Sequence, residues 1–302
     1  MAQLHECSTS NAQFEVLSNP EFLSEGTTIA NLLHPSRVLI GSQQTPSGSK
    51  AAATFAAVYK AWVPPERIKM MDCWSSELSK LAANAMLAQR LSSINSLSAI
   101  CEAGGGDVEE VATACGLDPR LGPEMMRSGL GWGGGCFEKD LLDLVYIARS
   151  LQLDAVANYW MAVVEMNDLQ KTRFLRRILS CMHGSLRGKA IAILGFAFKK
   201  DTSDTKGSPA IPVVQGLLAE GAHVAIYDPM VRASQIQAAL GPSSVRICAT
   251  AYEACYQAEA VVVVTDWDEF RMGASPSPSP SPLGSRCLTP DSSPETAHAC
   301  LD

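Results

Sequence analysis

Apolar residues recur at helical spacing through the middle of the chain. Between residues 74 and 103 they follow the period of a helix without an intervening proline, which predicts one long helix. Three further helices are expected, over residues 107–115, 138–151 and 156–182. The first of these has Asp107 as its N-cap and is stopped by Gly116. Residues 73–184 are therefore predicted to form a central helical block.

Short apolar runs and mixed α/β patterning precede this block. A helical pattern near residues 50–62 ends at Pro64 and Pro65. The short apolar runs lie at residues 14–17, 37–41 and 68–71. Residues 1–72 thus resemble the tail of an α/β domain.

Alternating strands and helices follow the helical block. Buried strands are expected at residues 190–195, 223–227 and 260–264. A helix at about residues 208–220 lies between the first two strands. This order is typical of a parallel, doubly wound sheet, which binds ligands at the carboxyl ends of its strands. Those ends carry Phe198, Lys199, Asp228 and Thr265.

A serine-proline alternation over residues 275–282 ends this pattern. Such a composition offers little apolar surface to bury, so we expect residues 273–302 to be disordered. The sheet domain is accordingly predicted to comprise residues 185–272.

Composition narrows the classes of partner. The chain has 302 residues, of which 47% are hydrophobic, enough to bury the cores of about two domains. A net charge of -7 without a cluster of basic residues argues against nucleic acid and membranes as partners. The ten cysteines form no Cys-x-x-Cys pair and no secretory signal is present, so reduced thiols and a cytosolic location are expected. The five histidines share no spacing that would build a metal site.

Cys136 closes a glycine-rich run that begins at Gly129. The run matches the pattern of a dinucleotide-binding loop, but it follows no strand, so we reject that interpretation. Glycines let a ligand approach the backbone, and the run places Cys136 in the first turn of a helix, where a thiolate is favoured. The alternative is one buried thiol among ten, and loop and helix by themselves favour that alternative.

Other candidate residues have equally ordinary explanations. Lys80 and Asn84 share one helix face and could converge on one oxygen, or they are a solvated lysine and an interior asparagine. Glu21 and Glu25 could supply a general base, or they mark a charged helix start. Lys199, which follows a strand, could bind phosphate or lie on the surface.

Four strings in the same order resemble the UDP-glucose/GDP-mannose dehydrogenase family, in particular its UDP-glucose 6-dehydrogenases, over about residues 14–271. They are VLSNPEFLSEG at 16–26, WSSELSKLAANA at 74–85, GGGCFEKD at 133–140 and ILGFAFKKDT at 193–202. The resemblance implies an α/β protein with an N-terminal Rossmann NAD domain, a long central helix for dimerisation and a C-terminal Rossmann-like UDP-binding domain. It also implies oxidation of UDP-glucose to UDP-glucuronate in two steps, with NAD as cofactor.

The resemblance assigns a role to each catalytic candidate. Cys136 would attack the sugar C6 carbonyl and carry a thioester. Lys80 would donate hydrogen bonds to the oxyanion, and Asn84 would help to orient it. Asp140 would hold the attacking water or tune its basicity, and Glu21 would assist thioester hydrolysis as general base.

The resemblance also implies binding roles. Glu25 would lie near both sugar and nicotinamide, and Lys206 stands where the family has an arginine near NAD. Arg120 matches an arginine that reaches the neighbouring subunit's sugar site, so a homo-oligomer is expected. The remaining expected substrate contacts are Arg127, Gly131, Trp132, Gly133, Phe198 and Lys199.

Two departures from the family pattern affect the expected activity. No strand and glycine-rich pyrophosphate turn precede Phe14, and the serine-proline tail stands where the family continues into further strands. We therefore expect a piece of a longer NAD-dependent dehydrogenase whose N-terminal domain is only a remnant over residues 1–72. One alternative is a catalytically inactive homologue that binds UDP-sugar or partner subunits. Another is a dehydrogenase for a different nucleotide sugar.

Overall fold

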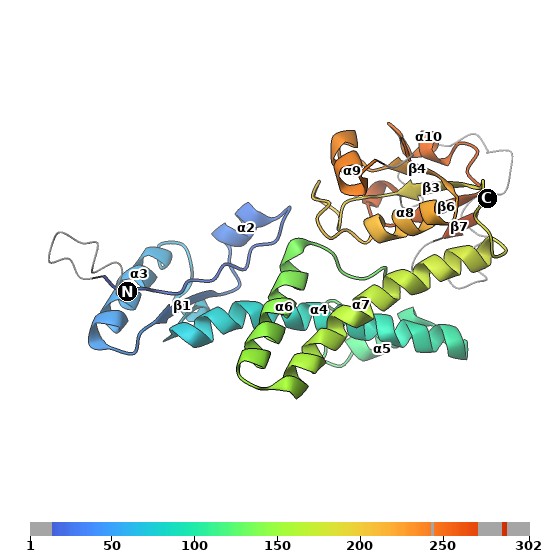
Figure 1. Ribbon diagram of the computed structural model, residues 1–302. Helices are drawn as coiled ribbons and strands as arrows, with labels where there is room; N and C mark the ends of the chain where they lie inside the picture. Colours follow the sequence, from blue (N-terminus) through green and yellow to red (C-terminus); the bar gives the residue numbers. More distant parts are fainter. Residues whose placement is uncertain (1–13, 243–244, 271–285, 289–302) are drawn as a thin grey trace. The chain divides into compact units, whose positions relative to one another are not determined.

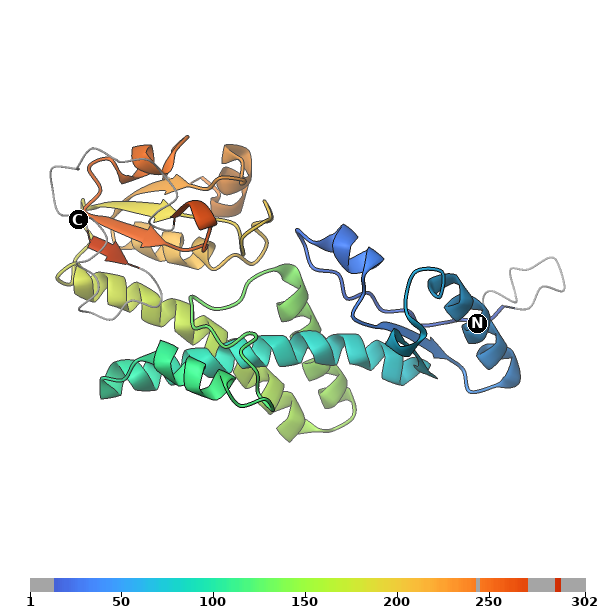
Figure 2. The same cartoon turned by 180° about the vertical axis from the view of Figure 1, so that it is seen from behind.

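The computed structural model describes residues 14–242, 245–270 and 286–288. The chain divides into two compact units, Met1–Asn84 and Ala85–Asp302, and the boundary lies inside helix α4, Cys73–Gly104. This helix confirms the long helix expected from residue 74. Figures 1 and 2 show the fold from opposite sides. Within the described ranges no helix is long and apolar enough to cross a bilayer.

The first unit is a small parallel α/β structure that leads into α4. Its elements are α2 (Thr28–Leu33), β1 (Val38–Ser42), α3 (Pro46–Tyr59), the 3-10 turn Pro65–Arg67 and β2 (Ile68–Asp72). The two strands pair in parallel with Val38 opposite Ile68, and α3 connects them. Ile40, Ala52 and Ala56 are buried and form the centre of its core. Burial of small side chains lets α3 lie close to the strands.

Two details of this unit differ from the sequence pattern. Helix α3 begins at Pro46 and not near residue 50, because Thr45 caps the helix by accepting a hydrogen bond from the N–H of Gly48 at 3.0 Å. The apolar run at residues 14–17 forms no strand. It leads to an isolated antiparallel bridge between Ser18 and Gly41.

Helices dominate the first half of the second unit. They are the remainder of α4, then α5 (Val108–Gly116), α6 (Gly135–Ser150) and α7 (Asp154–Cys181). The Asp107 side chain accepts a hydrogen bond from the Glu109 N–H at 2.7 Å, which confirms it as the N-cap of α5. Helices α6 and α7 pack along one another. Helix α6 begins at Gly135, three residues earlier than the pattern indicated, because Gly134 adopts a positive φ of 86° as its N-cap.

A parallel five-stranded sheet follows, in the order β5-β4-β3-β6-β7. Its elements are β3 (Ala190–Leu194), α8 (Ala210–Ala219), β4 (His223–Tyr227), α9 (Ala233–Leu240), β5 (Val245–Ile247), α10 (Ala251–Cys255), β6 (Ala260–Val263) and β7 (Arg286–Leu288); a short 3-10 turn, Asp268–Phe270, follows β6. The expected strands and the α/β class are confirmed. The expected alternation included a helix between the second and third strands without bounds. The structure has α9, β5 and α10 there, each too short to show a clear period.

Strand β7 corrects part of the prediction for the tail. The sequence predicts disorder over residues 273–302, yet Arg286–Leu288 pairs in parallel with β6. Backbone pairing along the free edge of β6 requires no apolar pattern in the added strand. The other residues of this predicted segment lie outside the described ones.

The helices and the sheet of the second unit share one hydrophobic core. Ile178 on α7, Ile193 on β3 and Leu217 on α8 are each fully buried in it. Helix α8 approaches α7 so closely that a Cβ on Gly216 would lie 2.4 Å from a methyl group of Leu175. Core burial therefore fixes the sheet against α7.

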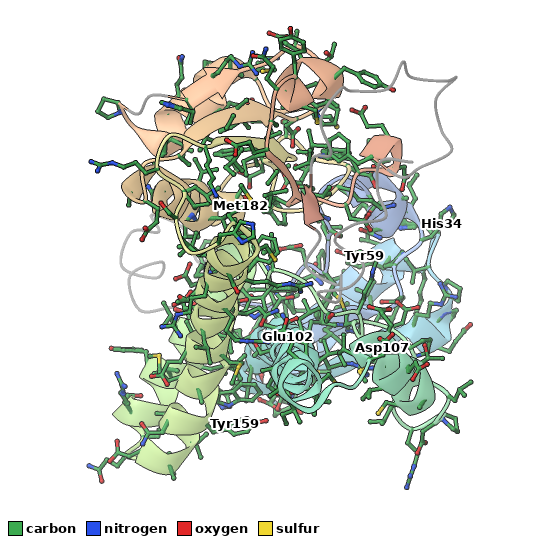
Figure 3. All side chains as sticks on the ribbon, turned by 90° about the vertical axis from the view of Figure 1, so that its right-hand side faces the viewer. His34, Tyr59, Glu102, Asp107, Tyr159 and Met182 are labelled. Carbon is green, nitrogen blue, oxygen red and sulfur yellow. The ribbon has the colours of Figure 1, made fainter. Side chains whose placement is uncertain are left out.

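Ion pairs add a link between α4 and α7. Glu102, which lies near the C-terminal end of α4 and is labelled in Figure 3, accepts hydrogen bonds from Arg173 at 2.6 Å and Arg177 at 3.4 Å. Both arginines are mostly buried, so these pairs are less screened than ordinary surface pairs.

Candidate active site around Cys136

Cys136 is the second residue of α6 and its side chain is exposed. Residues 129–135, here called the glycine loop, lead directly into this helix turn. The structure thus confirms that the glycines bring the thiol to a helix N-terminus. A thiol in this position is accessible to a ligand and lies where backbone N–H groups are not all used within the helix.

The glycine loop lies against residues 195–208, here called the 195–208 segment, which follow β3. A Cβ on Gly133 would lie 2.6 Å from the carbonyl oxygen of Gly207, and one on Gly134 would lie 2.9 Å from the Phe198 ring. A Cβ on Gly135 would lie 2.9 Å from the Lys206 side chain. Only glycine allows the approach of residue 133 to the Gly207 carbonyl, and a positive φ adds to the requirement at residue 134, whereas the flexible Lys206 side chain could move away from a Cβ at residue 135.

A backbone hydrogen bond joins these two segments directly. The N–H of Gly134 donates to the carbonyl of Lys206 at 3.1 Å. The structure therefore brings Phe198 and Lys206, two of the expected binding residues, to the loop that carries Cys136. Sequence spacing alone gave no reason to expect this contact.

The other side of the glycine loop is bonded to side chains from α4 and α7. Asn95 accepts a hydrogen bond from the Gly129 N–H at 2.9 Å, and Gln170 donates to the Gly129 carbonyl at 2.7 Å. Asn167 accepts from the Trp132 N–H at 2.8 Å and donates to the Trp132 carbonyl at 3.0 Å. Sequence reasoning missed all three amides, because a polar residue within a helical pattern is typical of a solvated face.

The 195–208 segment is itself fixed at the strand ends. The Asp228 carboxylate accepts hydrogen bonds from the N–H groups of Phe196 at 2.6 Å and Ala197 at 3.0 Å, and from the Trp267 indole at 3.1 Å. The Thr265 hydroxyl donates to the Ala197 carbonyl at 2.6 Å. Both Asp228 and Thr265 are buried, and their hydrogen bonds hold the backbone before Phe198.

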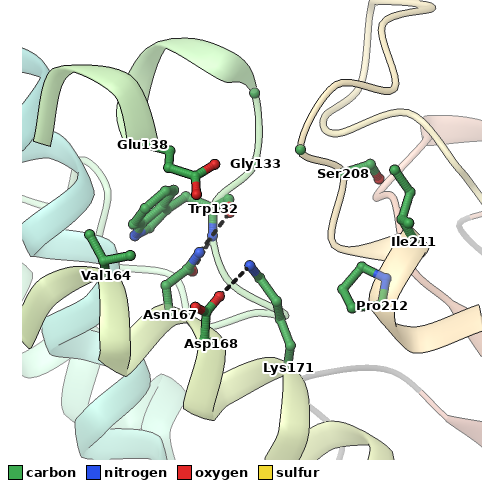
Figure 4. Close-up of a pocket in the computed structure, with 12 residues that line it drawn as sticks. Trp132, Gly133, Glu138, Val164, Asn167, Asp168, Lys171, Ser208, Ile211 and Pro212 are labelled. Carbon is green, nitrogen blue, oxygen red and sulfur yellow. Dashed lines mark hydrogen bonds and ion pairs between the residues drawn. The ribbon is translucent and has the colours of Figure 1, made fainter. Parts of the chain in front are cut away.

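A cavity of about 160 Å³ lies beside the glycine loop (Figure 4). Glu138 of α6 and the ion pair of Asp168 with Lys171, at 2.9 Å, contribute charged groups to it. Ile211 and Pro212 of α8 form an apolar side. The cavity borders the backbone of the glycine loop and so adjoins the site.

The remaining predicted residues of this unit differ in their surroundings. Arg127 pairs with Asp266 at 2.8 Å. Arg120 pairs with Asp118 at 2.6 Å, and this arginine holds the pKa of Asp118 below its usual range. Asp140 is buried one helical turn beyond the cysteine. Nothing in these contacts tests the binding roles expected of these residues.

Glu21, Glu25, Lys80 and Asn84 belong to the first unit. Glu21 accepts a hydrogen bond from the Leu23 N–H at 2.8 Å and forms an ion pair with Lys80. The hydrogen bond from Lys80 holds the pKa of Glu21 below its ordinary value. A general base works best with a pKa near the operating pH, so this contact opposes the role expected of Glu21.

Models of one protein family match three successive segments of the chain. Residues 1–63 match the NAD binding domain of the UDP-glucose/GDP-mannose dehydrogenase family, residues 74–169 its central domain and residues 192–277 its UDP binding domain. The chain belongs to the UDP-glucose/GDP-mannose dehydrogenase family. The domain boundaries at residues 72, 184 and 272 stay predictions.

Relatives within the family have the same residue as this chain at about half of the aligned positions. UDP-glucose 6-dehydrogenase 2 of Oryza sativa subsp. japonica is 49% identical over 286 residues, which cover 88% of this chain and 59% of the relative. UDP-glucose 6-dehydrogenase of Mus musculus is 53% identical over 271 residues, covering 86% of this chain and 55% of the relative. The chain thus spans little more than half the length of these curated relatives.

Among solved structures, a UDP-glucose dehydrogenase from Pyrobaculum islandicum superposes with a TM-score of 0.83 at 31% identity. The match covers 99% of this chain and 65% of the archaeal one.

The family match supports NAD as the cofactor, but the described residues of the first unit build no pyrophosphate cradle. At the turn from β1 to α3, Pro46 has no N–H, and the Gly48 N–H is bonded to Thr45. Residues 1–13, which the NAD-domain match includes, lie outside the described ones. Contacts of Glu25 and Lys206 with NAD stay predictions. Among the residues that the structure describes, no group of His, Cys, Asp and Glu could hold a metal ion.

Replacing Gly134 by alanine should destabilise the second unit by about 1–3 kcal/mol, because a positive φ and the Phe198 ring both oppose a Cβ. Gly129→Ala is the matched control, since a Cβ there meets nothing within 4 Å. Urea unfolding measures both variants. Equal midpoints for the two would show that the close approach does not exist.

Removing the Lys80 ammonium should raise the pKa of Glu21 toward its ordinary value. Because the folded pKa is lowered, the pair stabilises the fold above the unfolded pKa, and this contribution is lost as pH falls through the folded pKa. The gain is at most about 1 kcal/mol, since both side chains are partly exposed. An NMR titration of Glu21 in Lys80→Met, with Lys50→Met as control, measures the shift, and an unchanged titration contradicts the account.

Proposed function

We propose that this protein oxidises UDP-glucose to UDP-glucuronate with NAD as cofactor. The observation that carries the proposal is the exposed Cys136 thiol in the first turn of α6, beside a segment of the UDP-binding domain match that includes Phe198 and Lys206. Sequence identity of 49% and 53% to two UDP-glucose 6-dehydrogenases supports UDP-glucose as the substrate.

Cys136 would perform the covalent step. Its sulfur adds to the C6 carbon of the aldehyde that the first oxidation produces, and the thiol proton passes to the carbonyl oxygen, which gives a hemithioacetal. Oxidation of this adduct leaves a thioester, and water then releases the carboxylate and restores the thiol. When bound, NAD supplies the hydride acceptor.

Other residues retain the roles that the family resemblance gives them. We propose Lys80 and Asn84 for the oxyanion, Asp140 for the water, and Glu21 for general base catalysis. The substrate contacts proposed on the same ground are Glu25, Arg120, Arg127, Gly131, Trp132, Gly133, Phe198 and Lys199. The burial of Asp140 near Cys136 supports its part, and the lowered pKa of Glu21 weighs against that residue.

A homo-oligomer in the cytosol is part of the proposal. Met86 and Ile100 on α4 expose 60% and 66% of their surface, which is apolar area that a second copy of the long helix would cover. Sedimentation velocity measures the state, and a monomer at all concentrations contradicts this part.

Cys136→Ser should reduce the rate of NADH formation from UDP-glucose by about a thousandfold or more, because a hydroxyl in place of the thiol is a far poorer nucleophile. Absorbance of NADH measures the rate, and Cys101→Ser on α4 is the matched control. UDP binding by calorimetry should persist in both variants.

A substantial rate in Cys136→Ser would contradict the covalent role. If the wild-type chain binds UDP but forms no NADH from UDP-glucose, the protein is instead an inactive UDP-sugar binder. Turnover of another nucleotide sugar, but not of UDP-glucose, would change the substrate.

A further inference from the structure

We infer that Asn167 is a positioning residue for Cys136: its side-chain amide fixes the backbone of Trp132 and thereby the start of α6. The inference concerns the site of the proposed function and rests on it only for the consequence in catalysis. The position of the thiol itself can be measured without substrate or NAD.

The amide of Asn167 forms two hydrogen bonds to a single residue. Its Oδ1 accepts from the Trp132 N–H at 2.8 Å, and its Nδ2 donates to the Trp132 carbonyl at 3.0 Å. Asn167 is 1% exposed and Trp132 is 5% exposed, so water does not compete for these groups. Two bonds to the backbone of one residue hold the peptide units on both sides of its Cα, which fixes the position and the orientation of that backbone.

The amide of Asn167 satisfies both backbone groups at this position. The reversed amide would place donor against donor and acceptor against acceptor, so the hydrogen bonds define its orientation. A carboxylate would offer acceptors to both groups, and an apolar side chain would leave the Trp132 N–H and carbonyl buried without partners, each at a cost of about 1–3 kcal/mol.

Gly131 is matched to this asparagine. It adopts a φ of 110°, and a Cβ there would lie 2.3 Å from the Asn167 Oδ1. An alanine at residue 131 would therefore displace the amide that holds the next residue. The glycine and the asparagine act as one unit.

Trp132 is the last residue of the glycine loop with a side chain. Its indole N–H donates to Ser92 at 3.0 Å, and the Ser92 hydroxyl donates to the Val163 carbonyl at 2.9 Å. After Trp132 the chain passes through Gly133 to Gly135, which lie against the 195–208 segment, and then reaches Cys136. The position of Trp132 therefore sets where the glycines begin, and α6 starts from there.

The test measures alkylation of each cysteine by iodoacetamide in the full chain, followed by peptide mass spectrometry, with Cys115 on α5 as internal reference. Asn167→Ala should slow alkylation of Cys136 relative to Cys115 by about threefold or more, because release of Trp132 moves the start of α6 and takes the sulfur out of its exposed position. Asn158→Ala, an exposed asparagine on the same helix, is the matched control. Ile178→Ala controls for lost stability alone.

Asn167→Asp tests the inference through the pH dependence of Cys136 alkylation, which would not change if Asn167 only stabilised the fold. A protonated carboxyl can donate to the Trp132 carbonyl as the amide does, whereas a carboxylate cannot. The ratio of variant to wild-type alkylation of Cys136 should therefore rise toward one as the pH falls, and it should stay flat for Asn158→Asp. This variant decides the question if Asn167→Ala does not fold.

Three results would overturn the inference. They are a Cys136 rate in folded Asn167→Ala no slower than in wild type, a change shared equally by Ile178→Ala, and a pH-independent ratio in Asn167→Asp. If the chain oxidises UDP-glucose, Asn167→Ala should lower kcat more than it raises KM. Altered alkylation in a chain without dehydrogenase activity supports Asn167 and contradicts only the proposed function.

Discussion

The close approach of the glycine loop to the 195–208 segment is the constraint on which the candidate site depends. Gly133, Gly134 and Gly135 each face atoms that a Cβ would overlap, so the backbone itself forms the contact. These three glycines lead into the first turn of α6, which begins at Gly135. This approach is therefore one of the contacts between the helices and the sheet of the second unit, and it also leads to Cys136.

Buried polar side chains hold both sides of this contact. Asn167 and Gln170 of α7 bond the glycine loop, and Asp228 and Thr265 at the strand ends bond the 195–208 segment. Buried hydrogen bonds of this kind are costly to break, so they favour one defined backbone arrangement. A rigid carrier suits a nucleophile, because misplacement of a reacting group by about 1 Å can cost a hundredfold in rate.

The sequence predicted the elements that have a long period or a clear cap. Helix α4 and the N-cap Asp107 of α5 are of this kind, as is the placement of Cys136 in a helix turn. The interior role of Asn167 could not be predicted, because its partners are backbone groups thirty-five positions earlier in the chain. The glycines suggested close approach, but only the fold shows that Phe198 and Asn167 are what they approach.

Hydrogen exchange of the backbone amides in the glycine loop tests most directly whether the loop is held before substrate binds. The N–H groups of Gly129, Trp132 and Gly134 donate to Asn95, Asn167 and Lys206 respectively. We expect these three amides to exchange at least about a hundredfold more slowly than in an unstructured peptide. Exchange of all three at the rate of an unstructured peptide would contradict it.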